Sequence, residues 1–252
     1  MLDSLVKKLE HFLILPDHEK AWLSSLAIRT QEFPAHADIV RQDDTPIGVF
    51  VVIGGHACRY KILPDGSRQI LDFMFAGDMT ELHSLLLHST DHGILALGAT
   101  IIAWLDHERL LRETVNHPFV SLALWWSSLQ RIAILRERIA VIGRRHAYAR
   151  IAHLLCETFE RLRLIGEATD PHYLLPMTQV EVADALGISE IHANRMLRRL
   201  QREQLIRADH RSIQIPDITA LKTAGEFDGR YLHLDGVSAS VLRQLSVAEP
   251  PS

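Results

Sequence analysis

Residues 175–206, with the sequence LPMTQVEVADALGISEIHANRMLRRLQREQLI, constrain the fold of this chain more than any other stretch. Their apolar spacing predicts two short helices joined by a tight turn. Thr178 is suited to begin the first helix, because its hydroxyl can accept a hydrogen bond from an unpaired backbone N–H. Gly187 can end that helix, since glycine tolerates the left-handed conformation found there, and Ser189 can cap the second helix. The pattern is typical of a helix-turn-helix.

The second helix has two faces of different chemistry. Its apolar residues recur at helical spacing, and the predicted inward face consists of Ala193, Met196, Leu197 and Leu200. The predicted outward face consists of Glu190, Ile191, His192, Asn194, Arg195, Arg198 and Arg199. Arginine can bond to guanine edges or phosphates, and asparagine and histidine can bond to either. Because a helix-turn-helix places its second helix in the major groove, the outward face predicts double-stranded DNA as a partner.

The alternative is an ordinary helix pair whose charged face is solvated. The segment that follows argues against it, because Ile206-Arg207, a polar turn at Asp209-His210, and residues 212–215 before Pro216 predict a small β-wing. The short turn, two capping residues and a wing together favour a winged helix-turn-helix.

TQVEVADALGIS, followed by NRMLRRL and then LI, closely resembles the signature of the Crp/Fnr regulators, the catabolite-activator-like proteins. The resemblance covers most of the chain, is looser in the N-terminal half, and leaves roughly the last 25 residues unmatched. It implies a homodimeric transcription regulator whose two recognition helices enter successive major grooves ~34 Å apart at a near-palindromic site. It also implies RNA polymerase as a partner if the protein is an activator.

The resemblance also transfers DNA-facing positions to this chain. They are Ser189, Glu190, Ile191, His192 and Arg195, and Arg195 matches the family's guanine-contacting arginine. Glu190 and Ile191 stand where the cyclic-AMP activators have an arginine and a glutamate, so a different target sequence is expected. Asn194 belongs to the same predicted set, Arg198 and Arg199 are expected at phosphates, and Thr178 and Gln179 are expected to add backbone contacts.

Charge and cysteine content narrow the class of protein. The net charge is −4 and the pI about 6.4, so DNA binding must depend on a local basic patch, where Arg202 joins Arg195, Arg198 and Arg199. Two cysteines, Cys58 and Cys156, provide no disulfide framework and too few thiolates for a four-cysteine cluster, so no iron–sulfur cluster is expected. The chain shows no signal peptide and no membrane span, which predicts a cytoplasmic protein without a membrane partner.

The N-terminal half changes from helical to strand periodicity. Residues 2–29 are expected to be helical, with a second short helix beginning at Pro16-Asp17. Strands are then expected at residues 39–40, 49–53, 57–62, 69–75, 94–97 and 100–105, separated by turns at Gly54-Gly55 and at residues 64–67. Many short strands between such turns predict a jelly roll, and the expected fold class is therefore α+β.

This half resembles the cyclic-nucleotide-binding-type roll of the same family. VFVVIGGHACRYKILPDGSRQIL is similar to its central hairpin, and FAGDMTEL is similar to the segment in which Gly77 and Asp78 are retained. The resemblance predicts an effector pocket at Gly77, Asp78, Thr80, Glu81, Asp91 and His92. However, the cyclic-AMP binders carry an arginine for the cyclic phosphate, and residues 89–93 contain none. Because a buried phosphate needs such a partner, cyclic AMP is not the expected ligand, and the effector is unknown.

The histidines and Cys58 are the residues of this half that bear on other functions for the roll. His83, His88, His92 and His107 would suit a metal or haem site, but no compact ligand spacing supports one, so polar loop histidines are favoured and no metal site is predicted. Cys58 is expected to be a small core residue. A haem- or small-molecule-responsive sensor and a ligand-independent DNA-binding dimer stay open as alternatives. An enzyme is not expected, because no nucleophile–base pair or phosphate loop is found.

A long helix is expected between the two halves. Pro118 can begin it, and residues 119–142 continue it. Its apolar seam, at the spacing of a two-stranded coiled coil, consists of Leu122, Trp125, Leu129, Ile132 and Ile139. Instead of a second subunit, this helix could pack on its own roll. Both contacts can exist together, with one face on the roll and the other on a second subunit. The family's dimerisation helix lies at this position, which predicts a homodimer, and residues 143–145 are the expected hinge.

The predicted organisation has four parts. Residues 1–116 form a sensor roll, 117–145 the dimerisation helix and hinge, 146–236 the winged helix-turn-helix, and 237–252 a tail. Within the third part, a helix at residues 147–164 is followed by a connecting loop at residues 166–176. After the wing, Asp217 is expected to cap a short helix, and Tyr231, Leu232 and Leu234 are expected to dock on the domain.

Overall fold

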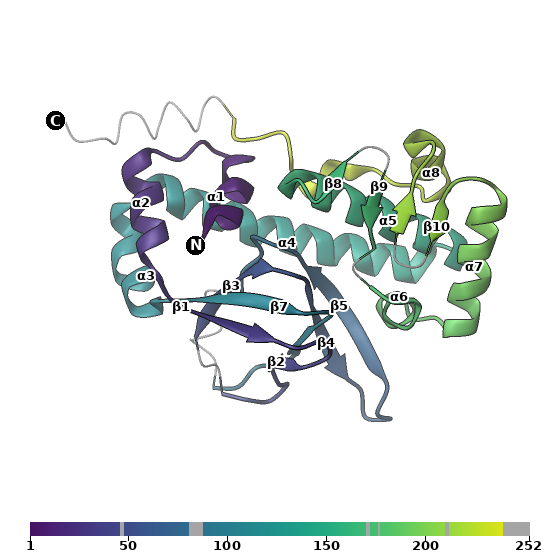
Figure 1. The fold of residues 1–252 in the computed structure, drawn as a ribbon, viewed down its shortest axis with the longest axis horizontal. Helices are drawn as coiled ribbons and strands as arrows, with labels where there is room; N and C mark the ends of the chain where they lie inside the picture. Colours follow the sequence, from purple (N-terminus) through teal and green to yellow (C-terminus); the bar gives the residue numbers. More distant parts are fainter. Residues whose placement is uncertain (46–47, 81–87, 170–171, 176, 210–211, 239–252) are drawn as a thin grey trace.

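The computed structural model describes residues 1–45, 48–80, 88–169, 172–175, 177–209 and 212–238. One long helix, α4 (Pro118–Arg144), crosses the middle of the molecule, with the β-roll against one side and the helix-turn-helix domain towards its C-terminal end (Figure 1). The fold is α+β, and the predicted order of roll, long helix and winged helix-turn-helix is confirmed.

The roll consists of two antiparallel sheets. Its strands are β1 (Ala27–Phe33), β2 (Asp38–Val40), β3 (Val49–Gly54), β4 (Ala57–Ile62), β5 (Arg68–Met74), β6 (Gly93–Ala96) and β7 (Thr100–Leu105). One sheet has the order β1-β7-β3 and the other β2-β6-β4-β5. Apolar residues of both sheets form a core between them, in which Phe50 and Trp104 meet edge to face at 5.2 Å. Aromatic pairs of this geometry add to the stability gained by burial.

The helices of the N-terminal half are α1 (Asp3–Glu10), α2 (Asp17–Ser25) and α3 (His107–Glu113), followed by a short 3₁₀ turn, η2 (Thr114–Asn116). The side chain of Glu19 in α2 is buried, and its carboxylate accepts hydrogen bonds from the N–H groups of Phe119 and Val120. These N–H groups lie in the first turn of α4 and have no partner within the helix. A carboxylate from another helix therefore fixes the start of α4 on the roll.

The expected helix through Arg29 is wrong at its end. Helix α2 stops at Ser25, and residues 27–33 form strand β1, which pairs with β7 from Ala27 opposite Leu105 to Phe33 opposite Thr100. Most of this strand is exposed, so it lacks the apolar alternation by which a half-buried strand is recognised. Pairing with a distant strand, rather than local pattern, gives this segment its conformation.

The C-terminal domain contains α5 (Ala147–Ile165), β8 (Ala168–Thr169), β9 (His172–Leu174), α6 (Gln179–Leu186), α7 (Glu190–Arg202), β10 (Arg207–Asp209), β11 (Ser212–Gln214), α8 (Ile218–Ala224) and the 3₁₀ turn η3 (Gly229–Leu232). Its sheet has the order β10-β11-β9-β8. Residues 166–176 were expected to be a connecting loop, but they contribute β8 and β9. The wing β10–β11 thus extends a small sheet across the outside of α5, where Tyr173 is buried.

The expected break at Gly143 is also wrong, because α4 continues through it to Arg144. Nothing lies within 4 Å of a Cβ added at Gly143, and a glycine in a helix costs only about 1 kcal/mol relative to alanine. The change of direction occurs at Arg145 and His146, whose backbone is extended between α4 and α5.

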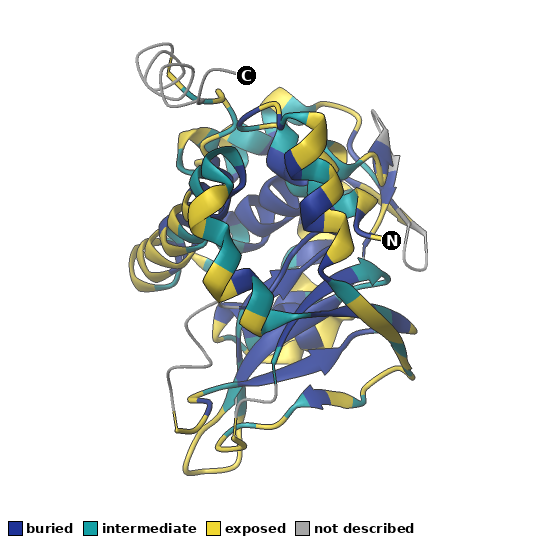
Figure 2. Ribbon diagram, turned by 90° about the vertical axis from the view of Figure 1, so that its left-hand side faces the viewer, coloured by how far each residue is buried: buried dark blue, intermediate teal, exposed yellow. Residues whose placement is uncertain are grey.

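One continuous core joins the C-terminal domain to the roll. It contains Phe73 and Ile70 of β5 together with Leu155 and Phe159 of α5. Figure 2 shows buried positions along the strands of the roll and along the turns of the helices that face inward. The two halves of the chain are therefore packed against each other, and within the described ranges no helix is long and apolar enough to span a bilayer.

Candidate DNA-binding face and effector region

The two helices of the helix-turn-helix are capped by their own side chains. The Thr178 hydroxyl accepts a hydrogen bond from the N–H of Glu181, and the Glu181 carboxylate accepts one from the N–H of Thr178 at 2.6 Å. This reciprocal pair is a capping box. Gly187 has φ +62°, which ends α6 in the left-handed conformation, and the Ser189 hydroxyl accepts from the N–H of His192. The tight turn is thus determined locally.

Helix α7 separates apolar and polar faces as predicted. Ala193, Leu197 and Leu200 are buried, and Met196 packs beside them half-buried. On the opposite face Ile191 has 84% of its surface exposed, which is unusual for a large aliphatic side chain. An exposed apolar residue among arginines suits contact with base edges, where thymine presents a methyl group.

A groove of about 960 Å³ follows the outer face of α7. We call it the recognition groove, and its lining residues are Glu190, Ile191, Asn194, Arg195, Arg198, Gln201 and Arg202. Every one of them belongs to α7, so the roll does not cover this groove. The structure thus brings together most of the outward residues expected from the sequence.

Gln201 and Arg202 line the recognition groove but were not among the predicted DNA contacts. Arg202 was counted in the basic patch only, and Gln201 was missed. Their positions three and four residues after Arg198 place them on its side of the helix. That spacing was available in the sequence as a signal.

Of the predicted residues between Ser189 and Arg199, three lie away from the recognition groove. Ser189 is a helix cap, and His192 is half-buried beside it. The Arg199 guanidinium forms an ion pair with Glu203 at 2.8 Å and stacks 4.5 Å from the centre of the Tyr148 ring. Arg199 therefore faces the start of α5.

A second groove, of about 190 Å³, lies between the start of α6, helix α7 and the wing. Its lining residues are Leu175, Met177, Thr178, Gln179, Asn194, Leu197, Arg198, Gln201, Ala208 and Ile213. The Asn194 amide donates a hydrogen bond to the Gln179 side chain. Asn194, Arg198 and Gln201 line both grooves, so the start of α6 and the outer face of α7 form one continuous surface.

Gly77 and Asp78 of the predicted effector set lie where the roll meets α1 and α5. Asp78 is buried and accepts hydrogen bonds from Lys8 of α1, from Arg161 of α5 at 3.1 Å and from the N–H of Phe75. Gly77 has φ +87°, and an added Cβ would lie 2.5 Å from the carbonyl oxygen of Ser4. Glycine is thus required where this turn touches α1. A cavity of about 20 Å³ beside Asp78 and Arg161 has room for about one water molecule.

Thr80, Asp91 and His92 are the other described residues of the predicted effector set. Thr80 is buried, and its hydroxyl accepts from the N–H of Phe50. Asp91 is largely exposed and lies 2.8 Å from His92 and 4.0 Å from Lys61. Glu81 lies outside the described residues, as does His83. The described members of the predicted pocket are therefore occupied by contacts within the protein or face solvent.

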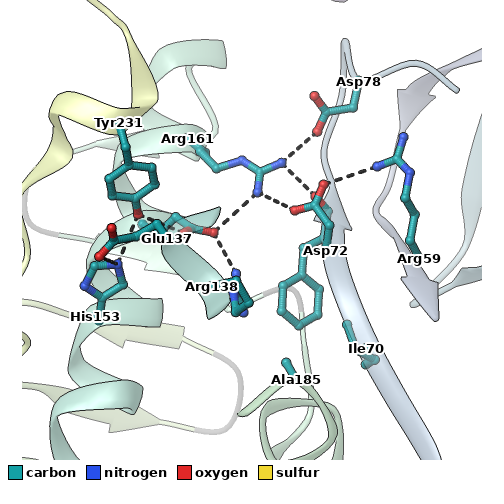
Figure 3. A network of polar contacts seen from close by, with 12 residues as sticks. Arg59, Ile70, Asp72, Asp78, Glu137, Arg138, His153, Arg161, Ala185 and Tyr231 are labelled. Carbon is teal, nitrogen blue, oxygen red and sulfur yellow. Dashed lines mark hydrogen bonds and ion pairs between the residues drawn. The ribbon is translucent and has the colours of Figure 1, made fainter. Parts of the chain in front are cut away.

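A buried polar network joins the roll to α5 (Figure 3). Arg161 donates to Asp72 at 3.0 Å and lies 3.5 Å from Glu157, which also accepts from Arg138 of α4 at 2.8 Å. Arg59 of β4 donates to the second oxygen of Asp72. Burial alone would raise the pKa of Asp78, but Lys8 and Arg161 beside it hold that pKa well below the usual range. Asp78 is therefore ionised, and each carboxylate of the network has a cationic partner.

The histidines and cysteines do not form a metal site in the described part of the chain, where no group of three or more His, Cys, Asp or Glu side chains is placed to hold a metal ion. Cys58 and Cys156 are buried free thiols, and burial raises the pKa of each to about 12. At neutral pH these thiols are protonated, and protonated thiols are poor nucleophiles and poor metal ligands.

The predicted seam of α4 faces outward. Trp125, Leu129, Ile132 and Ile139 are 70%, 59%, 49% and 73% exposed, and Leu122 is half-buried. The opposite face, with Val120, Ala123 and Leu124, packs on the roll. Both partners considered for this helix are thus compatible with its position, and a contiguous exposed apolar stripe is typical of a protein–protein interface.

Sequence profiles match both halves of the chain. The profile of the Crp-like helix-turn-helix domain matches residues 149–224, and that of the cyclic nucleotide-binding domain matches residues 30–117. The chain is 27% identical over 212 residues to the transcriptional activatory protein AadR of Rhodopseudomonas palustris, which covers 84% of each chain. It is 26% identical over 189 residues to the nitrogen fixation regulation protein FixK of Bradyrhizobium diazoefficiens, covering 75% and 78%.

Solved structures share the fold. FixK2 from Bradyrhizobium japonicum superposes with a TM-score of 0.69 and 23% identity, covering 84% of this chain and 98% of that one. A CooA mutant from Carboxydothermus hydrogenoformans superposes with a TM-score of 0.64 and 20% identity, covering 86% and 89%.

Proposed function

We propose that this chain, which belongs to the Crp/Fnr family of DNA-binding transcription regulators, binds a near-palindromic DNA site as a homodimer through the recognition groove of α7. The observation that supports this most directly is the exposure of that groove. Its arginines and Ile191 project from a helix whose other face is buried, and no residue of the roll lines it. Such a helix fits the major groove of B-DNA.

Within the groove we assign different roles to the basic residues. Arg195 lies one turn after the capped start of α7, which is the part of a recognition helix that contacts base edges. Arg198 and Arg202 follow further along the helix, where phosphates are the expected partners. Thr178 and Gln179 add contacts from the start of α6. Arg199 is a weaker candidate for a phosphate contact, because its guanidinium is already paired with Glu203.

Dimerisation is assigned to the outward seam of α4. A twofold pair of α4 helices would cover Trp125, Leu129, Ile132 and Ile139 in both protomers, and apolar residues at this spacing pair in coiled coils. The dimer then presents two copies of α7 to two half-sites. Because a twofold axis relates the two copies, the target should be an inverted repeat.

Several relatives are named as activators, among them the transcriptional activator protein FnrA of Stutzerimonas stutzeri. On that basis we propose activation, with RNA polymerase as the protein partner. For the roll we do not propose cyclic AMP, because residues 89–93 lack the phosphate-binding arginine and Asp91 would repel an anion. A different small-molecule effector is compatible with the roll.

Selection of duplexes from a random DNA pool by the purified protein tests this function. The selection is performed at ~0.15 M salt with no added effector, because binding to DNA phosphates depends strongly on salt. Enrichment of one inverted repeat is the expected result. Sequence-independent binding that disappears with salt, both alone and after addition of a small-molecule extract, would contradict the proposed function.

A further inference from the structure

The segment that follows α8 runs back across the molecule. We call residues 225–237 the C-terminal strap. They lie beyond the range matched by the helix-turn-helix profile. From the end of α8 the strap passes along α5 and α4 and reaches α1, where the N–H of Val237 donates to the carbonyl of Phe12 at 2.9 Å (Figure 1). The strap therefore touches the DNA-binding domain, α4 and the segment that follows α1.

On α5 the strap is held closely. A Cβ added at Gly225 would lie 2.6 Å from the backbone nitrogen of His153. The Tyr231 hydroxyl donates to Glu157 at 2.8 Å and lies 3.2 Å from the ring nitrogen Nε2 of His153. Both His153 and Glu157 are 2% exposed, so these contacts are shielded from water, which strengthens them.

On α4 the strap is held by two buried side chains. The indole of Trp126 donates to the carbonyl of His233 at 3.2 Å, and the amide of Gln130 donates to the carbonyl of Leu232. Leu232 itself is 1% exposed. Phe12 of the α1 region stacks on Trp126 with ring centres 4.9 Å apart. The strap thus closes a contact in which α4 and the N-terminal helices meet.

The same contacts reach the roll through charged groups (Figure 3). Glu157, which accepts from Tyr231, also accepts from Arg138 and lies beside Arg161. Arg161 in turn donates to Asp72 and Asp78 of the roll. Rotation of α5 relative to α4 would separate the strap from Glu157 on one side, or from Trp126 and Gln130 on the other.

Arg145 and His146 are the backbone link between α4 and α5, and the strap adds contacts to both helices beside the bond between Arg138 and Glu157. We propose that the C-terminal strap holds the DNA-binding domain in the orientation that exposes the recognition groove, so that DNA binding requires no effector. This rests on the proposed function of α7. It adds that a segment of the chain itself performs the ordering that a ligand of the roll would otherwise perform.

Matched truncations test the proposal. One variant ends at Phe227 and lacks most of the strap, and its control ends at Val237 and retains it. We measure affinity for the selected duplex without effector, and hydrogen exchange of β5 and α6, which are joined by the ion pair Arg68–Asp184. Ending at Phe227 should weaken DNA binding at least about tenfold and speed the exchange, because affinity falls with the competent fraction. Ending at Val237 should change neither.

A point variant guards against misfolding of the truncated chain. Tyr231→Phe keeps the ring and removes the hydroxyl that bonds to Glu157, and should weaken DNA binding severalfold. The control Arg230→Ala removes an exposed guanidinium that pairs with Asp228, and should have no effect.

The outcomes separate the two proposals. Unchanged affinity without the strap, tighter binding without it, or faster exchange at unchanged affinity would each overturn the role of the strap while the DNA-binding function stands. Binding that requires an added effector would also overturn it. If the full-length protein selects no sequence under any condition, the proposed function itself fails.

Discussion

Individual side chains carry two separable tasks in this molecule. On α7, exposed arginines of similar chemistry differ in surroundings: Arg195 and Arg198 line the recognition groove, whereas Arg199 is paired with Glu203. At the hinge, His153 lies in a buried polar cluster where Arg145 donates to its Nδ1 at 2.7 Å. The arginines of α7 are proposed to contact DNA, whereas the cluster around His153 holds the DNA-binding domain against α4.

Arg195→Ala and Arg198→Ala should affect DNA binding differently. If Arg195 bonds to a base edge, its loss costs about 1–3 kcal/mol and relaxes the preference at one base pair. If Arg198 bonds to a phosphate, its loss weakens all sequences alike and reduces the salt dependence by about one ion. Binding isotherms for the selected site and single-base variants at several salt concentrations distinguish them. Equal losses on every sequence for both variants would remove the assignment of Arg195.

The free energy of unfolding should depend on pH through the lowered pKa of His153. Burial lowers the pKa of His153 to about 4, and Arg145 and Arg138 nearby act in the same direction, against Glu157. Between pH 6.5 and 4 the unfolded state binds a proton that the native state does not, so stability falls as pH falls through this window, by up to about 3 kcal/mol. Urea titrations at several pH values should show a shallower dependence for His153→Gln. His18→Gln, at an exposed site, is the control.

Among the elements, the hairpins and the helix caps are determined by residues close in sequence, whereas several element boundaries are determined by contacts with distant residues. Thr178, Glu181, Gly187 and Ser189 determine where α6 and α7 begin and end, and these limits were predictable from residue type. Strands β1 and β9 were not, because each pairs with a strand distant in sequence, and β8 pairs in turn with β9. Helix α4 continues past Gly143 to Arg144, because a glycine in a helix costs only about 1 kcal/mol relative to alanine.

Leu129→Asp should dissociate the proposed dimer. Leu129 lies at the middle of the outward seam of α4, and a carboxylate there would be buried without a partner in the interface. Light scattering after size exclusion should show a monomer that retains the fold by circular dichroism and binds the inverted repeat weakly. Ile14→Asp places the same charge on an exposed aliphatic side chain outside the seam and should leave the dimer intact. A dimeric Leu129→Asp protein would place the interface elsewhere.

Across the whole molecule, the roll and the DNA-binding domain are joined by charge as well as by apolar packing. Arg161 lies at the centre, with side-chain bonds to Asp72 and Asp78 and a bond to the carbonyl of Phe73. Removing Arg161 takes away the cation that lies between three buried carboxylates, so that Asp72, Asp78 and Glu157 each lose one ionic partner.

Arg161→Ala should therefore destabilise the protein by about 3–5 kcal/mol. Because the lost contacts join two domains, denaturant unfolding should also separate into two transitions, monitored by tryptophan fluorescence and by circular dichroism. Arg163→Ala, on the same helix, removes a half-exposed ion pair with Glu160 and should cost less than about 1 kcal/mol. A small effect of Arg161→Ala would show that the network is not needed to join the domains.

Local chemistry thus explains which parts of this protein were predictable. Helix periodicity, the capping residues and the turns specify the helices of the helix-turn-helix, the long helix and the β4–β5 hairpin, because each depends on residues near one another in the sequence. The outward face of α7 follows from the same periodicity.

The effector region behaves in the opposite way. Gly77 and Asp78 resemble the family's ligand-binding segment, yet Asp78 bonds to Lys8 and Arg161, which lie far away in sequence. The strap likewise owes its position to Trp126, Gln130 and Glu157 on two other helices. Side-chain identity states what a residue can bond to, but which partner it meets depends on how distant segments pack, and that is a property of the folded chain.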